Sequence, residues 1–354
     1  MREARETAEN ANVDNLFADR RVLITGAAGS VGAALSQRLA AAGATLGLLD
    51  HFDHGLLRVA DELADANNGA RFEILLCSVR DQGALTRAVA EFAPDLVIHA
   101  AALKHVHLGE LHPAECVLTN LIGVRNALAA AHAAGVGEFM LISSDKAAAP
   151  TCVMGASKRL AELYLHGFAA ERRTPMRLAA VRFGNVMGSQ GSVAPRFADQ
   201  IERGGPVTVT HPEMERYFLT MEEAVSHVLS VCALAPEHKT GAAFVMDMGE
   251  PIAILRLAEE MIARAESDAE IAITGIRPGE KLTEQWFDDW EIAEQSALDG
   301  VFVVRPRPEA GHVSSFDISE LESAAQQGMD PKALRARVFS CLEARLRIPA
   351  AATA

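Results

Sequence analysis

Residues 21–32 of the chain read RVLITGAAGSVG, an apolar run that ends in three glycines spaced three residues apart. The residues that follow, up to position 43, place apolar side chains at helical spacing. The pattern therefore predicts a strand, a tight turn and a helix, in that order. Gly26, Gly29 and Gly32 suit a turn whose backbone approaches a ligand closely and whose helix packs tightly on the strand.

The same alternation continues along the chain. Further strands are predicted at 45–50, 71–79, 95–102, 138–144 and 176–186, with helices at 56–66, 81–93, 115–134 and 154–171 between them. Strands separated by helices of this length are typical of βαβ units. We therefore predict an α/β fold with a Rossmann-type, doubly wound parallel sheet.

The glycine turn predicts a dinucleotide cofactor. A helix that starts at such a turn directs its N-terminus at a pyrophosphate. Asp50 ends the next strand, where a carboxylate can accept hydrogen bonds from an adenosine ribose, although it could also cap a helix. No arginine directly follows Asp50 to bind a 2′-phosphate, which favours NAD over NADP.

After about Asn185 the regular alternation gives way to segments rich in glycine, proline and threonine. We predict four parts: an N-terminal extension (1–19), an NAD-binding Rossmann domain (20–185), a smaller and mainly substrate-binding domain (186–345), and a flexible tail (346–354). Some of the chain in the third part is expected to return to the Rossmann core.

Composition excludes several classes of protein. The chain has 354 residues, 49% of them hydrophobic, and a formal net charge of −14, which argues against a nucleic-acid partner. Its five cysteines show no CxxC spacing, and the histidines in KHVHLGELHP lack a ligand pattern, so no metal is expected. No apolar run approaches the ~18 residues of a membrane span, and no signal peptide is evident. We expect a cytoplasmic homo-oligomer.

Reactive side chains gather at the end of the strand at 138–144. Ser144, Asp145 and Lys146 follow it, at the edge where open α/β sheets bind ligands. Short-chain dehydrogenases/reductases place a Tyr-x-x-x-Lys pair on the next helix, and this chain keeps Lys158 but has Met154 in place of the tyrosine. Methionine cannot transfer a proton. Either catalysis has been lost, or acid–base chemistry has moved to Asp145 and Lys146.

Six segments resemble one family, and they run in order over about residues 20–290. The chain is similar to the UDP-N-acetylglucosamine 4,6-dehydratases of polysaccharide biosynthesis, which belong to the extended short-chain dehydrogenases/reductases. Methionine at the position of Met154 is typical of members that retain the C5 configuration. The segments are TGAAGSVG, HAAALKHV, SSDKAAAPTCVMGASKRLAE, RFGNVMGSQGSVAPRF, VTVTHPEMERYFLTMEEA and TGIRPGEKLTE.

The resemblance implies a mechanism. NAD oxidises the sugar at C4, which acidifies the C5 proton, and the cofactor later reduces C6. Lys146 takes the C5 proton, and protonated Asp145 donates to the departing C6 hydroxyl. Ser144 binds the C4 oxygen, and Lys158 holds the nicotinamide ribose. With no tyrosine present, Asp145, directly or through water, is the candidate that deprotonates the C4 hydroxyl.

The resemblance also implies the remaining contacts. Those to the cofactor involve the glycine turn, the adenine pocket, where the family usually has Asp at the position of Ser78, and the end of the strand at 95–102. These residues are Ser30, Val31, Ser78, Val79, Ala100, Ala101 and Ala102. Those to the UDP-sugar involve a lysine on a loop, the uridine and diphosphate sites and the RPGE motif. These residues are Lys104, Asn185, Val186, Ser192, Val193, Arg216, Arg277 and Glu280.

Two other functions are compatible with the same fold. A sugar-nucleotide 4-epimerase would need a proton-transfer group at the position of Met154, and the chain lacks one. A catalytically silent NAD-binding regulator would be expected to have lost the Asp145–Lys146 pair, and the chain keeps it.

Overall fold

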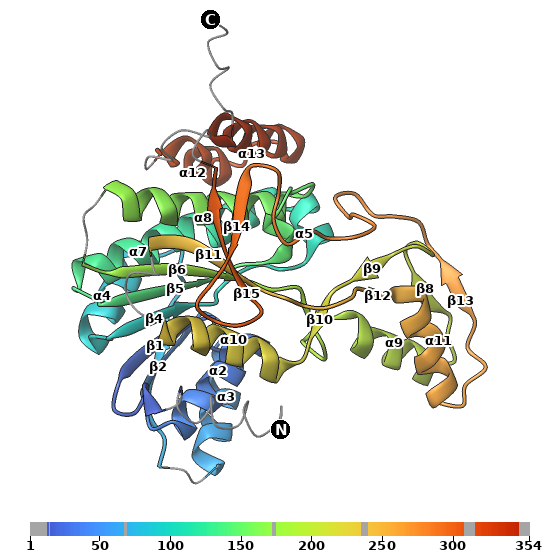
Figure 1. Ribbon diagram of the computed structural model, residues 1–354, viewed down its shortest axis with the longest axis horizontal. Coiled ribbons are helices and arrows are strands. Elements are labelled where there is room, and N and C mark those ends of the chain that lie inside the picture. Colours follow the sequence, from blue (N-terminus) through green and yellow to red (C-terminus); the bar gives the residue numbers. More distant parts are fainter. Residues whose placement is uncertain are drawn as a thin grey trace, which may run out of the picture.

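A large sheet runs through the main part of the molecule (Figure 1). The computed structural model describes residues 13, 15–66, 69–171, 175–234, 240–307 and 316–346, and within these ranges nine strands form the sheet, in the order β14-β15-β11-β6-β5-β4-β1-β2-β3. Its strands are β1 (Arg21–Thr25), β2 (Thr45–Asp50), β3 (Arg71–Leu76), β4 (Leu96–His99), β5 (Glu138–Ile142), β6 (Arg177–Arg182), β11 (Thr240–Met246), β14 (Glu291–Gln295) and β15 (Val301–Pro306).

The sheet is parallel from β3 to β11, and only β15 and β14 at the far edge pair antiparallel. The order β3-β2-β1-β4-β5-β6 reverses direction between β1 and β4, which creates the crevice where open α/β sheets bind ligands. The prediction of a doubly wound parallel sheet is therefore confirmed. The two antiparallel edge strands were not predicted.

Helices cover both faces of the sheet, so its central strands, β2, β1, β4, β5 and β6, are buried on both sides. One apolar core lies under α4 (Gln82–Phe92), α7 (Gly123–Ala133), α8 (Val153–Glu171), α12 (Ser319–Gln326) and α13 (Pro331–Leu346). The other lies under α2 (Ser30–Ala41), α3 (Asp53–Asp65) and α10 (Met221–Ala233). Figure 1 shows α12 and α13 stacked above α8, so the C-terminal helices belong to the larger part.

The helix predicted at 115–134 is interrupted, and this is a correction. The structure has α6 (Pro113–Cys116), a π-helical stretch at Val117–Ile122, and then α7. The wide turn holds the buried Asn120, whose side chain accepts a hydrogen bond from Leu103 N (2.8 Å) and donates to Leu103 O and Ser157 Oγ, both at 3.0 Å. Such π-helical turns are frequent at functional sites. Here the turn fixes the loop that carries Lys104.

A small lobe projects from the sheet (Figure 1). It has its own apolar core around Phe197, Val209 and Ile254. Its elements are α9 (Val193–Glu202), β8 (Val207–Val209), β9 (Glu215–Arg216), β12 (Ile252–Ala253), α11 (Ile254–Arg264) and β13 (Ile271–Ile273). The chain between them, which forms α10 and β11, lies in the larger part. Most of the predicted extension (1–19) and tail (346–354) lies outside the described residues.

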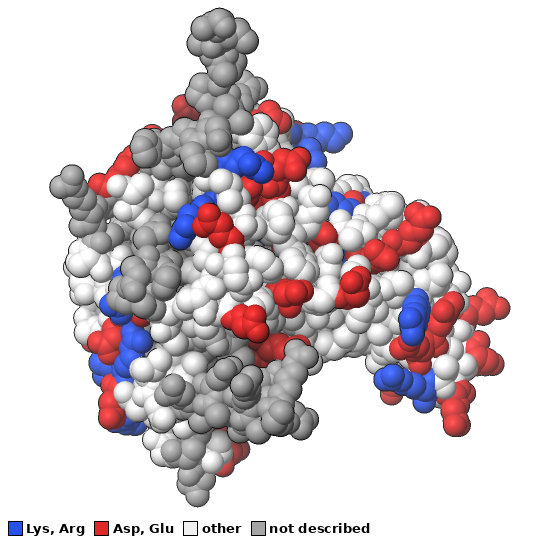
Figure 2. Space-filling model, viewed as in Figure 1, with Lys and Arg blue, Asp and Glu red and all other residues white. Residues whose placement is uncertain are grey.

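Figure 2 shows acidic and basic side chains intermixed on one face of the molecule. Several of the basic groups are held in ion pairs with neighbouring acids, for example Arg203 with Asp199 and Arg256 with Glu260, both four residues apart on small-lobe helices. Paired arginines of this kind add little to stability and make little free positive charge available to a phosphate backbone.

The buried His227 of α10 makes stability depend on pH. Its side chain is 3% exposed, and burial lowers its pKa to about 4. The unfolded chain binds this proton near pH 6.5 and the folded chain only near pH 4, so stability falls as the pH drops through that window. Between pH 7 and pH 5, the free energy of unfolding of His227→Leu, measured with urea, should fall by about 2 kcal/mol less than that of the wild type. The exposed His54→Leu should show the wild-type loss, and an equal loss in His227→Leu would contradict the prediction.

Candidate active site

Two glycines at the turn between β1 and α2, Gly26 and Gly32, have no room for a side chain. Gly26 has a φ of +71°, and a Cβ on it would lie 2.6 Å from Ala101 N. A Cβ on Gly32 would lie 2.1 Å from Gly26 O. The turn thus brings bare backbone to the mouth of the crevice, where it can meet a pyrophosphate closely. Its geometry fits a dinucleotide.

A cavity of about 620 Å³ extends from this turn toward the small lobe. Most of the predicted site residues line it. They are Gly26, Gly29, Ser30, Val31, Gly32, Ala100, Ala102, Lys104, Ser144, Lys146, Met154, Lys158, Asn185, Val186, Ser192 and Val193. The other predicted residues do not line it. These are Asp50, Ser78, Val79, Ala101, Asp145, Arg216, Arg277 and Glu280.

Asp50 organises the backbone at the adenosine end. Its Oδ2 accepts a hydrogen bond from Ala28 N (3.1 Å), and its Oδ1 accepts from His51 N (2.8 Å) and Phe52 N (3.1 Å). The carboxylate therefore joins the glycine turn to the start of α3. Asp50 does not cap α3, because the N-cap residue is Phe52 and no side chain caps that helix. The predicted contact of Asp50 with a ribose stays a prediction.

Ser144, Asp145 and Lys146 form a compact group after β5. Asp145 Oδ1 accepts hydrogen bonds from Ser144 Oγ (2.9 Å) and from Lys146 Nζ (3.0 Å). Asp145 is 1% exposed and lies behind the other two, which face the cavity. Lys146 Nζ also donates to Asn185 Oδ1 (3.2 Å). An acid and a base thus stand in direct contact at one wall of the cavity.

The protonation of Lys146 is governed by a second carboxylate as well. Glu284 Oε1 lies 3.8 Å from Lys146 Nζ. Burial would lower the pKa of Lys146, but the charges of Asp145 and Glu284 outweigh burial and raise that pKa above its ordinary value. Sequence reasoning missed Glu284. The only signal was its place at the end of the TGIRPGEKLTE segment.

Met154 and Lys158 lie one helical turn apart on α8 and both face the cavity. Lys158 Nζ donates to Ile142 O at 2.8 Å, and burial lowers its pKa to about 8. Burial, with a smaller contribution from the positive charge of Lys158, lowers the pKa of His99 to about 3, so His99 is neutral and shares a 3.0 Å hydrogen bond with Thr25 Oγ1. Met154 offers the cavity only an apolar surface.

The opposite wall comes from the loop at 103–105 and the loop before α9. Lys104 Nζ donates to Ser189 Oγ (3.4 Å), and burial lowers the pKa of Lys104. Gln190 N donates to Ser30 Oγ at 3.0 Å, which joins this loop to the helix of the glycine turn. The two lobes are therefore in contact across one end of the cavity. Ser189 and Gln190 were not predicted as site residues.

Three residues predicted to contact the phosphates or the nucleotide ribose do not line the cavity: Arg216, Arg277 and Glu280. Arg216 is buried, and its Nη1 donates to the backbone oxygens of Glu215 (2.6 Å) and Leu282 (3.0 Å). Arg277 N donates to Glu280 Oε2 (3.1 Å), so these two residues form one turn. That turn lies on the segment that carries Glu284 back from the small lobe.

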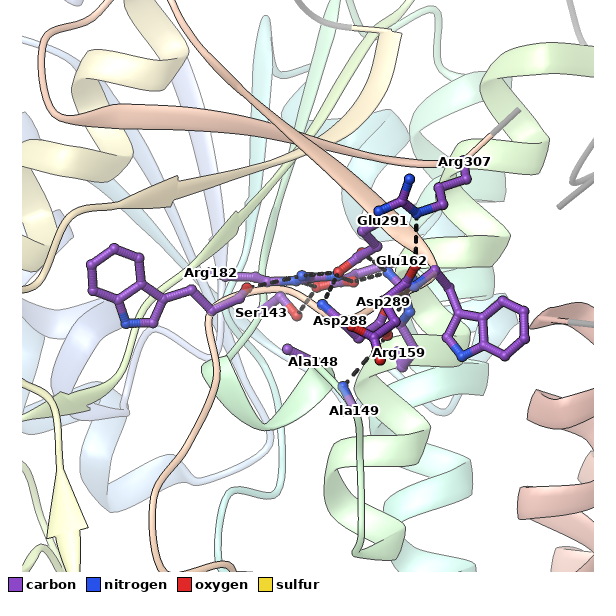
Figure 3. Close-up of polar contacts among 12 residues, drawn as sticks. Ser143, Ala148, Ala149, Arg159, Glu162, Arg182, Asp288, Asp289, Glu291 and Arg307 are labelled. Carbon is purple, nitrogen blue, oxygen red and sulfur yellow. Dashed lines mark hydrogen bonds and ion pairs between the residues drawn. The ribbon is translucent and has the colours of Figure 1, made fainter. Parts of the chain in front are cut away.

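A buried ion network anchors this returning segment (Figure 3). Arg182, at 0% exposure, donates to both oxygens of Glu162 (2.8 and 2.5 Å) and of Glu291 (2.9 and 2.7 Å). Arg159 pairs with both acids. Burial would raise the pKa of Glu291, but the two arginines lower it to about 2. Ser143 Oγ donates to Glu162 Oε1 at 2.5 Å, so the network reaches the residue next to Ser144.

Residues 22–306 match the model of the family described as "Polysaccharide biosynthesis protein". The chain belongs to this family. The resemblance seen in the sequence is thereby confirmed at the level of the polysaccharide-biosynthesis family.

Curated members of this family and related enzymes are similar over most of the chain. The capsular polysaccharide biosynthesis protein CapD of Staphylococcus aureus is 39% identical over 82% of this chain, and the probable polysaccharide biosynthesis protein EpsC of Bacillus subtilis is 39% identical over 98%. The chain spans only 49% and 57% of the length of these two proteins. A UDP-glucose 4-epimerase of Rickettsia conorii is 32% identical, over 80% of this chain and 82% of that protein.

Solved structures share the fold. Pen from Bacillus thuringiensis has a TM-score of 0.75 and 27% identity, over 88% of this chain and 99% of that chain. DesIV from Streptomyces venezuelae, a dTDP-glucose 4,6-dehydratase with NAD and TYD bound, has a TM-score of 0.65 and 20% identity, over 75% of this chain and 87% of that chain.

In the part of the chain that the structure describes, no helix has the length and apolar character that a membrane crossing requires. In the same ranges no three His, Cys, Asp or Glu side chains are grouped to hold a metal ion. His105, for example, lies against Gly191 at the cavity, where a Cβ on the glycine would be 2.8 Å from its Cε1.

Proposed function

We propose that the chain is an NAD-dependent 4,6-dehydratase of UDP-N-acetylglucosamine that retains the configuration at C5 and serves surface polysaccharide synthesis. The observation that carries the proposal is the Asp145–Lys146 contact of 3.0 Å at the wall of the cavity, with Met154 where related enzymes have tyrosine. Dehydration needs a base at C5 and an acid at the C6 hydroxyl, and this pair contains one of each.

The cofactor in this proposal is NAD. The turn at Gly26 and Gly32 presents bare backbone to its pyrophosphate, and DesIV, which has the same fold, has NAD bound. Lys158 lies in the same cavity and would hold the nicotinamide ribose. When bound, NAD supplies reversible oxidation of the sugar at C4 and reduction at C6.

The pair becomes reactive by an internal proton transfer. Lys146 holds a proton in the resting site, because its pKa is raised. Asp145 Oδ1, 3.0 Å away, can accept this proton, which leaves a neutral amine and a carboxylic acid. Lys146 then takes the C5 proton. The C4 hydroxyl proton would pass to a water molecule, because Asp145 is already protonated, and a proton from water would restore the Lys146 ammonium after C5 has been reprotonated.

Ser144 connects the buried acid with the cavity. Asp145 does not line the cavity, whereas Ser144 does and is hydrogen-bonded to Asp145 Oδ1 at 2.9 Å. Protonated Asp145 would donate to Ser144 Oγ, and Ser144 would pass its own proton to the C6 hydroxyl as it leaves as water. This adds a relay to the predicted contact of Ser144 with the C4 oxygen.

The second candidate is a sugar-nucleotide 4-epimerase, which the 32% identity with the Rickettsia conorii epimerase favours. Incubation with UDP-N-acetylglucosamine separates the two functions. We expect mass spectrometry to show a product that has lost one water, with no build-up of NADH, because the cofactor is regenerated in each cycle. An isomer of unchanged mass would favour the epimerase, and NADH formed in proportion to product would indicate a simple dehydrogenase.

The same reaction reports the stereochemistry at C5. With Lys146 as the proposed base and no tyrosine at the position of Met154, the C5 proton should leave and return on one face. The fresh product should be UDP-2-acetamido-2,6-dideoxy-xylo-hexos-4-ulose, with a nuclear Overhauser contact between H3 and H5. Early product without that contact would contradict retention.

A further inference from the structure

Glu284 is a buried carboxylate that lies between two lysines. Its side chain is 4% exposed and comes from the segment between β13 and β14. Its Oε1 lies 3.8 Å from Lys146 Nζ, and its Oε2 lies 3.6 Å from Lys281 Nζ. Among the described residues, Oε2 has no hydrogen-bond partner. A buried carboxylate oxygen without a hydrogen bond is costly, and the two lysine charges offset that cost here.

The two lysines differ in what else they contact. Lys281 Nζ already donates to Ala148 O at 2.9 Å, so it fastens the returning segment to the loop after Lys146. Lys146 Nζ donates to Asp145 Oδ1 at 3.0 Å and to Asn185 Oδ1 at 3.2 Å. Glu284 Oε1, at 3.8 Å, lies beyond hydrogen-bond distance and acts on Lys146 through its negative charge, which favours the protonated amine over the neutral one.

We propose that Glu284 is a positioning residue for Lys146, which fixes the amine at the back of the cavity and stabilises its protonated form. The amine then gives up its proton to Asp145 during the reaction and not to solvent beforehand. This inference rests on the proposed function for its catalytic meaning, but its effect on Lys146 can be measured without substrate.

Other charged groups act on Lys146 from the elements around it. Asp145 acts in the same direction as Glu284, whereas burial and Arg216 of β9 act in the opposite direction. Cys152, just before α8, is held as a neutral thiol because burial raises its pKa. Glu284 comes from a distant part of the chain, so it can be replaced without changing Asp145 or Lys146 themselves.

The test is the rate at which acetic anhydride modifies Lys146 at pH 8, followed by mass spectrometry of its peptide. Only the neutral amine reacts. Removal of one charge at this distance should lower the pKa of Lys146 by about one unit, so Glu284→Gln should speed acetylation roughly tenfold relative to the exposed Lys332. Glu260→Gln, on the surface of α11, should leave the rate unchanged. An unchanged or slower rate in Glu284→Gln would overturn the proposal.

Two further measurements complete the test. Should Glu284→Gln not fold, Glu284→Asp withdraws the carboxylate by one methylene and should speed acetylation about threefold; no change there overturns the proposal. In turnover assays, the high-pH limb of kcat/KM should move about one unit lower in Glu284→Gln, since the active pair must keep one proton. If Lys146 is acetylated faster in Glu284→Gln but the wild-type protein does not dehydrate UDP-N-acetylglucosamine, the proposed function alone is rejected. If the wild-type protein is an active dehydratase but Lys146 is acetylated at the wild-type rate in Glu284→Gln, only the role of Glu284 is rejected.

Discussion

Lys146→Ala is expected to reduce the turnover of UDP-N-acetylglucosamine by at least about a hundredfold, because among the described residues Lys146 is the amine that contacts Asp145, and without it the C5 proton loses its acceptor. The fall should appear in kcat, since the proposed role of Lys146 is proton transfer and not anchoring of the nucleotide. Initial rates of water loss, followed by mass spectrometry, measure the effect.

Two variants make this result specific. Lys146→Arg keeps the positive charge beside Asp145 but cannot become a neutral base near neutral pH, so it should be as inactive as the alanine variant. Lys332→Ala removes an exposed lysine from α13 and should retain full activity. A Lys146→Ala enzyme with more than a tenth of the wild-type rate would refute the assignment of Lys146 as the base.

Gly32→Ala should weaken NAD binding by roughly thirtyfold or more. The new Cβ would lie 2.1 Å from Gly26 O and 2.8 Å from Gly26 C, and both are backbone atoms that cannot rotate away. The turn must shift, and an overpacked site of this kind costs ~2 kcal/mol or more. Calorimetric titration with NAD and the amount of NAD that co-purifies are two independent measurements.

A matched glycine shows whether the effect comes from the turn. Gly83 lies in the first turn of α4, where a Cβ would meet its nearest neighbours at 3.6 Å, an ordinary contact. Gly83→Ala should bind NAD as wild type does. Equal affinity in Gly32→Ala would mean that the glycine turn is not the pyrophosphate site.

The parts that the sequence predicts well are those whose signal is local. The strand–turn–helix at 21–41 and the group at 144–146 follow from periodicity and from the strand end, and the structure brings both to one cavity. Glu284 was not predicted because its contact with Lys146 joins residues far apart in the sequence. The antiparallel strands β14 and β15 were not predicted because their pairing depends on how the chain returns from the small lobe. The π-helical stretch was not predicted because, in the sequence, Asn120 is a single polar residue in an otherwise helical pattern.

The buried arginines tie the two halves of the sequence into one folding unit. Arg182 and Arg159 come from β6 and α8, whereas Glu291 and Asp288 come from more than a hundred residues later. Without the later segment, both guanidinium groups would remain in the core with Glu162 as their shared carboxylate, an arrangement that costs several kcal/mol. The nucleotide-binding half therefore does not carry all the carboxylates that its buried arginines need. A domain boundary at residue 185, where the sequence motifs place it, would separate Arg159 and Arg182 from Asp288 and Glu291 beside the candidate active site.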